Sequence, residues 1–215
     1  MYLILYPVTI NKIIMRKIQF VLVLLLVINC KAQTEIIGLK DRRGGEIPQG
    51  AYLQDIDNDM DSFVGIYEYN NNGIVFRIHL LKKTMVHVDN YFTDTLIGEI
   101  EYYENNTQLV NTTSQLYTNF TNPYDHAIVN SEILNNSPNI SFRCPECVLN
   151  EIVIDGSIFD TRLGGDLLLR RITVNGNPAL KISIFTYASS KKIQLGEPQT
   201  LPIIPGGDYI MVKLP

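Results

Sequence analysis

Side chains that alternate between apolar and polar, in runs bounded by Asn-Gly turns, are the feature that most constrains this chain. Strands are expected at 166–174 and 179–187, and Asn175-Gly176 lies between them. A β-strand points successive side chains to opposite faces, so alternation with period two predicts a strand. Asn-Gly tolerates the positive φ of a tight hairpin turn. We therefore predict an antiparallel hairpin in this region.

The same pattern recurs along the chain. Asn70-Asn71-Asn72-Gly73 separates an alternating run, 63–69, from another at 74–81, and further strands are expected at 93–103 and 208–214. The Thr- and Asn-rich segment 112–120 lacks a helix cap followed by an apolar stripe. Short strands with regular turns and no helical crossovers predict an all-β fold, either an antiparallel β barrel or a β sandwich with hairpin connections.

The N-terminus has the pattern of an export signal. Met15 precedes two basic residues, and an apolar run of about eleven residues follows at 18–28. This run is too short to span a bilayer. We predict that translation starts at Met15 and that residues 1–29 are a signal peptide. The alternative is a transmembrane hairpin built from both apolar runs, which five residues would interrupt: Pro7, Asn11, Lys12, Arg16 and Lys17.

The exit of this signal allows two processing routes. Val27-Ile28-Asn29-Cys30 is similar to a lipobox, in which the cysteine is lipidated, although Asn29 stands where a small residue is usual. Ordinary cleavage after Ala32 would instead leave Gln33 first. We favour lipidation of Cys30, because a lone cysteine at the end of the apolar run has no other evident role. The expected location is the cell envelope, as a periplasmic or outer-membrane-attached lipoprotein with the membrane as partner.

The mature chain is expected to consist of a polar arm, 30–62, and one antiparallel β domain, 63–215, with 105–151 as a long Asn-rich excursion. Removing the signal takes away three basic residues and no acid, which changes the formal charge from −4 to −7. Nucleic-acid binding depends on clustered Lys and Arg. We therefore expect no nucleic-acid partner.

Cys144-Pro145-Glu146-Cys147 is the most specific local motif. A C-x-x-C pair can be a structural disulfide, half of a metal site or a redox centre. A metal site would need two more ligands, which His79, His87 and His126 would have to supply. In a redox-active pair, a helix normally begins at the first cysteine and lowers the pKa of its thiol. We favour the structural disulfide, because exported proteins fold in an oxidising environment.

The other candidate motifs predict no chemistry. Asp55, Asp57 and Asp59 match the first ligand positions of a calcium loop, but Met60 stands where Gly is required and Ile66 where a bidentate Glu is required. A solvated acidic loop is the simpler interpretation. The nucleophile elbow, the zinc-protease helix motif and the phosphate-binding glycine loops are absent from the sequence. We expect no cofactor, and a binding or structural module rather than an enzyme.

Several motifs together resemble a family of small exported proteins of Flavobacterium-like Bacteroidota that is catalogued only as a domain of unknown function. They are Cys-Lys-Ala-Gln at 30–33, Ile-Pro-Gln-Gly-Ala-Tyr-Leu at 47–53, Phe-Val-Gly-Ile-Tyr at 63–67, Cys-Pro-Glu-Cys at 144–147 and the closing Gly-Asp-Tyr-Ile-Met-Val-Lys at 207–213. The resemblance implies an envelope location and no particular activity. Phe-x-Gly-x-Tyr is also similar to the opening strand of lipocalin-like barrels, which have Trp where this chain has Tyr67.

These features predict an envelope lipoprotein with a non-catalytic β module that binds a protein partner or a small apolar ligand. In a barrel, Tyr67, Phe76 and Tyr102 would point inward and line the ligand site, or simply form the core. The alternative function is a redox or metal-binding protein that uses Cys144 and Cys147. A third is a purely structural or adhesive surface protein.

Overall fold

The computed structural model describes residues 15–20, 34–41, 46–135, 146–148, 151–159, 164–186 and 202–215. The chain divides into two units, Met1–Thr34 and Glu35–Pro215. In the first unit, residues 15–20 form a short helix. No helix among the described residues has the length and apolar character needed to cross a membrane.

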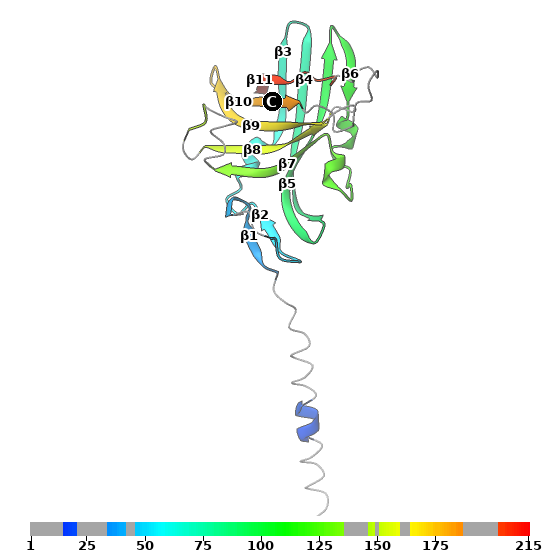
Figure 1. The fold of residues 1–215 in the computed structure, drawn as a ribbon, viewed down its shortest axis with the longest axis vertical. Coiled ribbons are helices and arrows are strands. Elements are labelled where there is room, and N and C mark those ends of the chain that lie inside the picture. The colour runs from blue at the N-terminus through cyan, green and yellow to red at the C-terminus, as the bar shows by residue number, and fades with distance from the viewer. Residues whose placement is uncertain are drawn as a thin grey trace, which may run out of the picture. The chain divides into compact units, whose positions relative to one another are not determined.

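The second unit is built from one sheet, which in the described part of the chain has eleven strands (Figure 1). The strands are β1 (Ile36–Gly38), β2 (Tyr52–Gln54), β3 (Gly65–Asn71), β4 (Ile74–Val88), β5 (Tyr91–Glu104), β6 (Thr107–Asn111), β7 (Ile128–Asn135), β8 (Ile152–Phe159), β9 (Gly164–Val174), β10 (Asn177–Thr186) and β11 (Gly207–Lys213). Four 3-10 turns join them: η1 (Leu39–Asp41), η2 (Asp59–Phe63), η3 (Thr113–Gln115) and η4 (Pro123–Asp125). The all-β prediction is confirmed.

The predicted hairpins are confirmed as well. β9 and β10 pair antiparallel from Asn177↔Val174 onward, and β3 pairs antiparallel with β4. Between β9 and β10, Asn175 has φ 50° and Gly176 has φ 80°. Both residues therefore adopt the left-handed conformation that a two-residue hairpin turn requires. The segment 112–120 contains only the short turn η3 and no α-helix.

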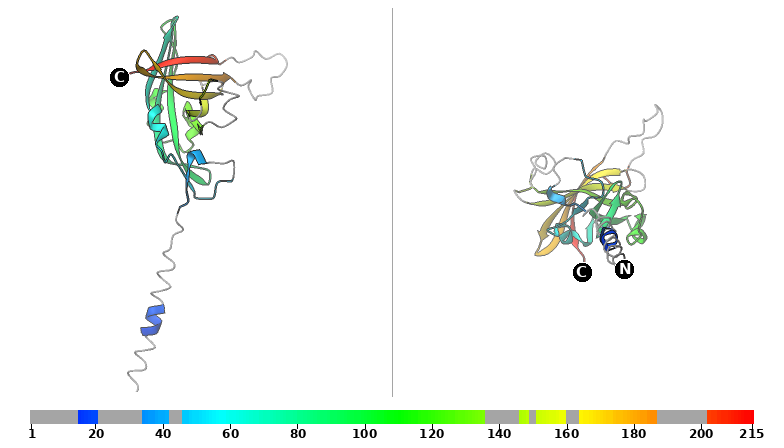
Figure 2. Two further views of the ribbon diagram at one scale, coloured as in Figure 1. Left: turned by 90° about the vertical axis from the view of Figure 1, so that its left-hand side faces the viewer. Right: turned by 90° about the horizontal axis from the view of Figure 1, so that it is seen from below.

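The strand pairings close on themselves. Each of β3, β4, β5, β7, β8, β9, β10 and β11 pairs antiparallel with the next in this order, and β11 pairs with β3. β6 lies outside this cycle and pairs with β5. Two of these pairings, which we call seams, each join only two pairs of residues. The β5–β7 seam includes Gly98↔Ile128, and the β11–β3 seam includes Lys213↔Tyr67. Figure 2 shows β9, β10 and β11 crossing the direction of β3, β4 and β5.

A continuous apolar core lies between the crossing strands. On β4, Phe76, Ile78 and Leu80 are at most 3% exposed, while the alternate residues Arg77 and His79 are only half-buried. This difference reflects the period of two. The same core cluster includes the buried residues Leu96, Ile100 and Tyr102 of β5, Ile154 and Ile158 of β8, Leu167 and Leu169 of β9, Leu180, Ile182 and Ile184 of β10, and Tyr209 and Met211 of β11. Burying each such side chain stabilises the fold by roughly 1.5–3 kcal/mol.

Two expected boundaries change. The segment 30–62, expected as a polar arm, contains β1 and β2, and β2 pairs parallel with β5. Leu53 and Met60 belong to the core, so the β unit begins at Glu35 rather than at residue 63. The segment 105–151, expected as an excursion, contributes β7 to the cycle, because apolar side chains of β7 are buried in the core.

Candidate functional site

The Phe-x-Gly-x-Tyr motif lies at the β11–β3 seam beside a lysine. Lys213 reaches across Gly65, donates a hydrogen bond from Nζ to the Val64 carbonyl oxygen at 2.7 Å, and places Nζ 5.6 Å from the centre of the Tyr67 ring. Gly65 has φ 142°, and a Cβ added there would lie 2.5 Å from Cε of Lys213. Glycine is therefore needed both for the backbone conformation and for the path of the lysine.

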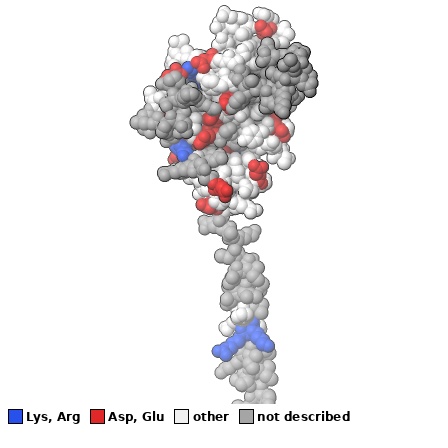
Figure 3. All heavy atoms as spheres, viewed as in Figure 1, with Lys and Arg blue, Asp and Glu red and all other residues white. Residues whose placement is uncertain are grey.

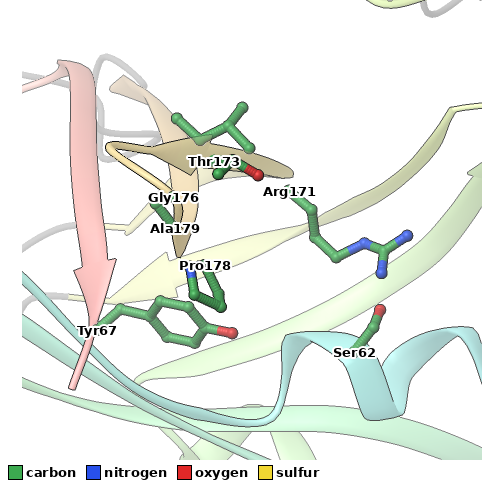
Figure 4. Close-up of a pocket in the computed structure, with 8 residues that line it drawn as sticks. Ser62, Tyr67, Arg171, Thr173, Gly176, Pro178 and Ala179 are labelled. Carbon is green, nitrogen blue, oxygen red and sulfur yellow. The ribbon is translucent and has the colours of Figure 1, made fainter. Parts of the chain in front are cut away.

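A pocket of about 360 Å³ opens beside this motif (Figure 4). Its walls come from η2, β3 and the β9–β10 hairpin. Arg171 projects from β9, and its guanidinium carbon lies 5.6 Å from the centre of the buried Phe63 ring. In Figure 4 the Arg171 guanidinium lies above the Ser62 hydroxyl, and the Tyr67 ring extends into the same space. The lining residues are Ser62, Tyr67, Arg171, Ile172, Thr173, Gly176, Pro178 and Ala179.

Arg171 and Lys213 differ from most cations of the β unit in having no carboxylate partner among the described residues. Salt bridges to carboxylates are made instead by Lys40, Arg77, Lys82, Arg170 and Lys181. The neighbour Arg170, for example, pairs with Glu151. Two positive charges without carboxylates thus lie around Tyr67, in a protein whose net charge is negative.

The Tyr67 hydroxyl is also unengaged. Tyr67 is 2% exposed, and no described residue forms a hydrogen bond with its hydroxyl. Burial raises the pKa of this hydroxyl, and the Arg171 charge acts in the opposite direction. Ser62 already donates its Oγ hydrogen to the Asp59 carbonyl oxygen, at 2.7 Å. The pocket therefore offers a cation, a phenolic donor and a hydroxyl acceptor.

Of the three residues expected to line a ligand site, only Tyr67 lines this pocket. Phe76 packs edge-on against Tyr102, with ring centroids 5.8 Å apart, and against Tyr209 at 5.2 Å. Burial, with the neighbouring tyrosines, raises the pKa of Tyr209 to about 12. Phe76 and Tyr102 are thus core residues in contact with other side chains. Arg171 and Lys213 were missed, because their convergence on the motif depends on strand pairing far along the chain.

A second polar cluster lies on the outward face of β5. Nδ1 of His126 lies 2.7 Å from Oε1 of Glu99, and the two side chains are 1% and 0% exposed. On the other side of the imidazole, Nε2 lies 3.3 Å from Nζ of Lys83, which also donates to the Thr118 carbonyl oxygen. Burial lowers the pKa of Lys83, and the Glu99 charge opposes that shift. The cluster holds the segment after β6 against β4 and β5.

A row of charges continues beside this cluster. Arg77 forms salt bridges with Glu68 at 2.6 Å and Glu101 at 3.3 Å, and Nε2 of His79 lies 2.8 Å from Glu101. Burial works against ionisation of Glu101, but hydrogen bonds from His79 and Tyr103 lower its pKa overall. The charges of Arg77, Glu68 and Glu101 neutralise one another. We therefore assign no binding role to this row.

The acidic run at 55–61, which leads into η2, is neutralised by lysines. Asp57 and Asp59 each lie 2.7 Å from Nζ of Lys40, and Asp55 lies 3.0 Å from Nζ of Lys82. Asp55 also accepts hydrogen bonds from the backbone N–H groups of Asp59 and Met60. Among the described residues no group of three His, Cys, Asp or Glu side chains could hold a metal ion. The carboxylates therefore shape a turn.

The cysteine predictions fall largely outside the described residues. Cys30 and Cys144 are not among them. Cys147 is half-buried and packs against Val153 and Leu168. The histidines proposed as further metal ligands lie in other clusters: His79 and His126 contact the glutamates named above, and His87 packs against Phe92 with ring centroids 5.1 Å apart.

Comparison with known proteins identifies one family. No curated protein and no solved structure matches the chain. A family model described as "Family of unknown function (DUF6705)" matches residues 15–214, which is most of the chain. The expectation of a family of unknown function is thereby confirmed, and the chain belongs to this family.

Proposed function

We propose that the protein is an exported envelope lipoprotein, anchored through Cys30, whose β unit is a small-ligand binding module. The basic start, the short apolar run and the cysteine that follows it support the anchor. The family match begins at residue 15, the position proposed for the start of translation.

We further propose that the β unit is a lipocalin-like antiparallel barrel. The closed cycle of pairings supports a barrel, because a sandwich leaves open edges between its sheets. The order of strands around the cycle follows the order along the chain, as in an up-and-down barrel. Lys213 strengthens the β11–β3 seam through its contacts with Val64 and Tyr67.

The pocket between η2 and the β9–β10 hairpin is the observation that supports binding. Its volume of about 360 Å³ is at the lower end of the range of ligand sites, roughly 300–1,000 Å³. Core side chains such as Phe76 and Tyr102 contact other aromatic rings. We therefore place the ligand in this pocket and not among the inward-facing residues of the cycle.

Native mass spectrometry of protein purified from its own envelope tests the binding proposal. Thr173→Trp introduces a large side chain at an exposed pocket position and should remove a co-purifying small molecule that the wild type retains. Thr107→Trp makes the same change at an exposed position of β6 and should leave that molecule bound. Identical spectra for the wild type and the Thr173 variant would contradict the proposed site.

Metabolic labelling with an alkyne fatty acid tests the anchor. The wild type should incorporate label and sediment with membranes, and Cys30→Ser should do neither. Cys144→Ser keeps Cys30 and serves as the control. Retention of label by the Cys30 variant would contradict lipidation at this residue.

We also infer that Cys144 and Cys147 form a structural disulfide. The half-buried packing of Cys147 against Val153 and Leu168 supports this role, because redox-active cysteines occur in exposed, electropositive surroundings.

A further inference from the structure

We propose that the pocket binds the carboxylate of a small organic acid, with Arg171 and Tyr67 as its recognition groups. This inference rests on the proposed function, since it names the chemical class of ligand for the same pocket. Tyr67 belongs to the motif at 63–67, whereas Arg171 lies on β9, outside every motif described above.

The first argument is charge. Arg171 lies at the pocket without a carboxylate partner among the described residues, whereas its neighbour Arg170 pairs with Glu151. The mature chain has a formal charge of −7, and the face seen in Figure 3 bears more acidic than basic side chains. Arg171 is exposed, so its positively charged guanidinium is accessible to an anion that enters the pocket. Lys213, held over the Tyr67 ring, adds to the positive potential nearby.

The second argument is hydrogen bonding. The Tyr67 hydroxyl lies on a residue that is 2% exposed, and no described residue accepts its hydrogen. The hydroxyl is not one of the fully buried polar atoms, so it is open to the pocket, where water or a ligand can accept its hydrogen. The side chains of Tyr67 and Arg171 both project into the pocket (Figure 4). A carboxylate can accept the phenolic hydrogen through one oxygen while the guanidinium binds the carboxylate.

The third argument is size and shape. A guanidinium binds a carboxylate through two parallel N–H···O bonds, and Arg171 is the one such fork among the lining residues. The rest of the wall includes Pro178, Ala179 and the face of Tyr67, which suit a short apolar or aromatic body. A multiply charged anion would be repelled by the net negative charge of the protein. A monocarboxylate with a compact apolar group fits these conditions.

Titration with benzoate and its neutral analogue benzamide tests the inference. The mature protein, from Cys30 onward, is titrated in detergent by isothermal calorimetry. Benzoate should bind more tightly than benzamide by about tenfold or more, the effect expected for a charge-assisted bidentate pair. Arg171→Gln should remove that preference, and Tyr67→Phe should weaken benzoate binding.

Arg170→Gln is the matched control, because it makes the same charge change at the adjacent residue, which pairs with Glu151. It should leave the benzoate preference intact. Circular dichroism of each variant confirms that it is folded. Arg171→Lys keeps the positive charge but removes the two parallel N–H donors of the guanidinium. Binding of inorganic phosphate with no binding of benzoate would overturn the carboxylate assignment.

The results separate this inference from the proposed function. If a ligand co-purifies with the wild type but not with Thr173→Trp, while benzoate and benzamide bind equally, the pocket is a binding site and the carboxylate inference is wrong. If no ligand co-purifies and neither compound binds, both proposals fail.

Discussion

Nδ1 of His126 lies 2.7 Å from Oε1 of Glu99, and the two side chains are 1% and 0% exposed. The second oxygen of Glu99 is buried without a hydrogen-bond partner in the described part of the chain. The pair joins β5 to the turn η4, and Lys83 extends it to β4. Such a pair is a structural element whose loss is costly, because either partner alone would leave a buried polar group unsatisfied.

Replacing one member of this pair should lower the free energy of unfolding more than replacing both members with apolar residues. His126→Ala leaves Glu99 buried without its partner and should lower the free energy of unfolding by about 3–5 kcal/mol. The double variant Glu99→Leu/His126→Phe removes both polar groups and should lose less. Urea denaturation measures both values. A double variant as unstable as the sum of its single variants would contradict this account.

Stability should fall in acid because of Glu101. Burial opposes its ionisation, but hydrogen bonds from His79 and Tyr103 lower its pKa below the ordinary value of 4.5. A carboxyl group whose pKa is lower in the folded state stabilises the fold above the unfolded-state pKa, and that contribution is lost as the pH falls through the folded-state pKa. Below about pH 4.5, Glu101→Gln should therefore show a shallower loss of stability than the wild type.

Thermal unfolding between pH 3 and pH 7 measures this slope, and Glu104→Gln, at an exposed position of the same strand, is the control. Equal slopes for the wild type and Glu101→Gln would show that this carboxylate does not contribute.

The seam between β5 and β7 should depend on Asn130. Its side-chain oxygen accepts hydrogen bonds from Oγ1 of Thr95 at 2.8 Å and from the Leu96 amide at 2.6 Å. Asn130→Ala leaves the Leu96 N–H without this acceptor and should lower the free energy of unfolding by about 1–3 kcal/mol. Hydrogen exchange at Leu96 should accelerate. Unchanged exchange at this amide would contradict closure of the strand cycle at this seam.

Gly65 and Lys213 should be energetically coupled. Gly65→Ala forces a strained φ and displaces Lys213 from Val64 and Tyr67, which should cost about 1–3 kcal/mol. Lys213→Met keeps the apolar stem and removes the amine. Because both changes disrupt the same contact, the double variant should lose less stability than the sum of the two. A strictly additive double-mutant cycle, measured by chemical denaturation, would contradict the coupling.

The cysteine pair should be oxidised. A thiol titration of the denatured, lipidated protein should find no free thiol before reduction. Loss of the disulfide through Cys144→Ser/Cys147→Ser should reduce stability by about 2 kcal/mol, as expected for a four-residue loop. Two titratable thiols in protein isolated from the envelope would favour the redox or metal alternative.

Local signals predicted the hairpins correctly, because a turn such as Asn175-Gly176 depends only on the backbone preferences of adjacent residues. β2 and β7 were missed for a different reason. β2 is three residues long and pairs parallel with β5, and β7 follows a long Asn-rich stretch, so tertiary packing decides their conformation. Tyr67, in the motif at 63–67, lines the pocket. Arg171 carries no local signal, since only the register of β9 brings it to the pocket.

A crystal structure of the chain from Lys31 onward, grown with benzoate, tests the central claim most directly. This chain retains the whole compact unit, which begins at Glu35. The account predicts benzoate between the Arg171 guanidinium and the Tyr67 hydroxyl, with its ring toward Pro178 and Ala179. An empty pocket at saturating benzoate, with Arg171 paired to a carboxylate of the protein itself, would contradict it.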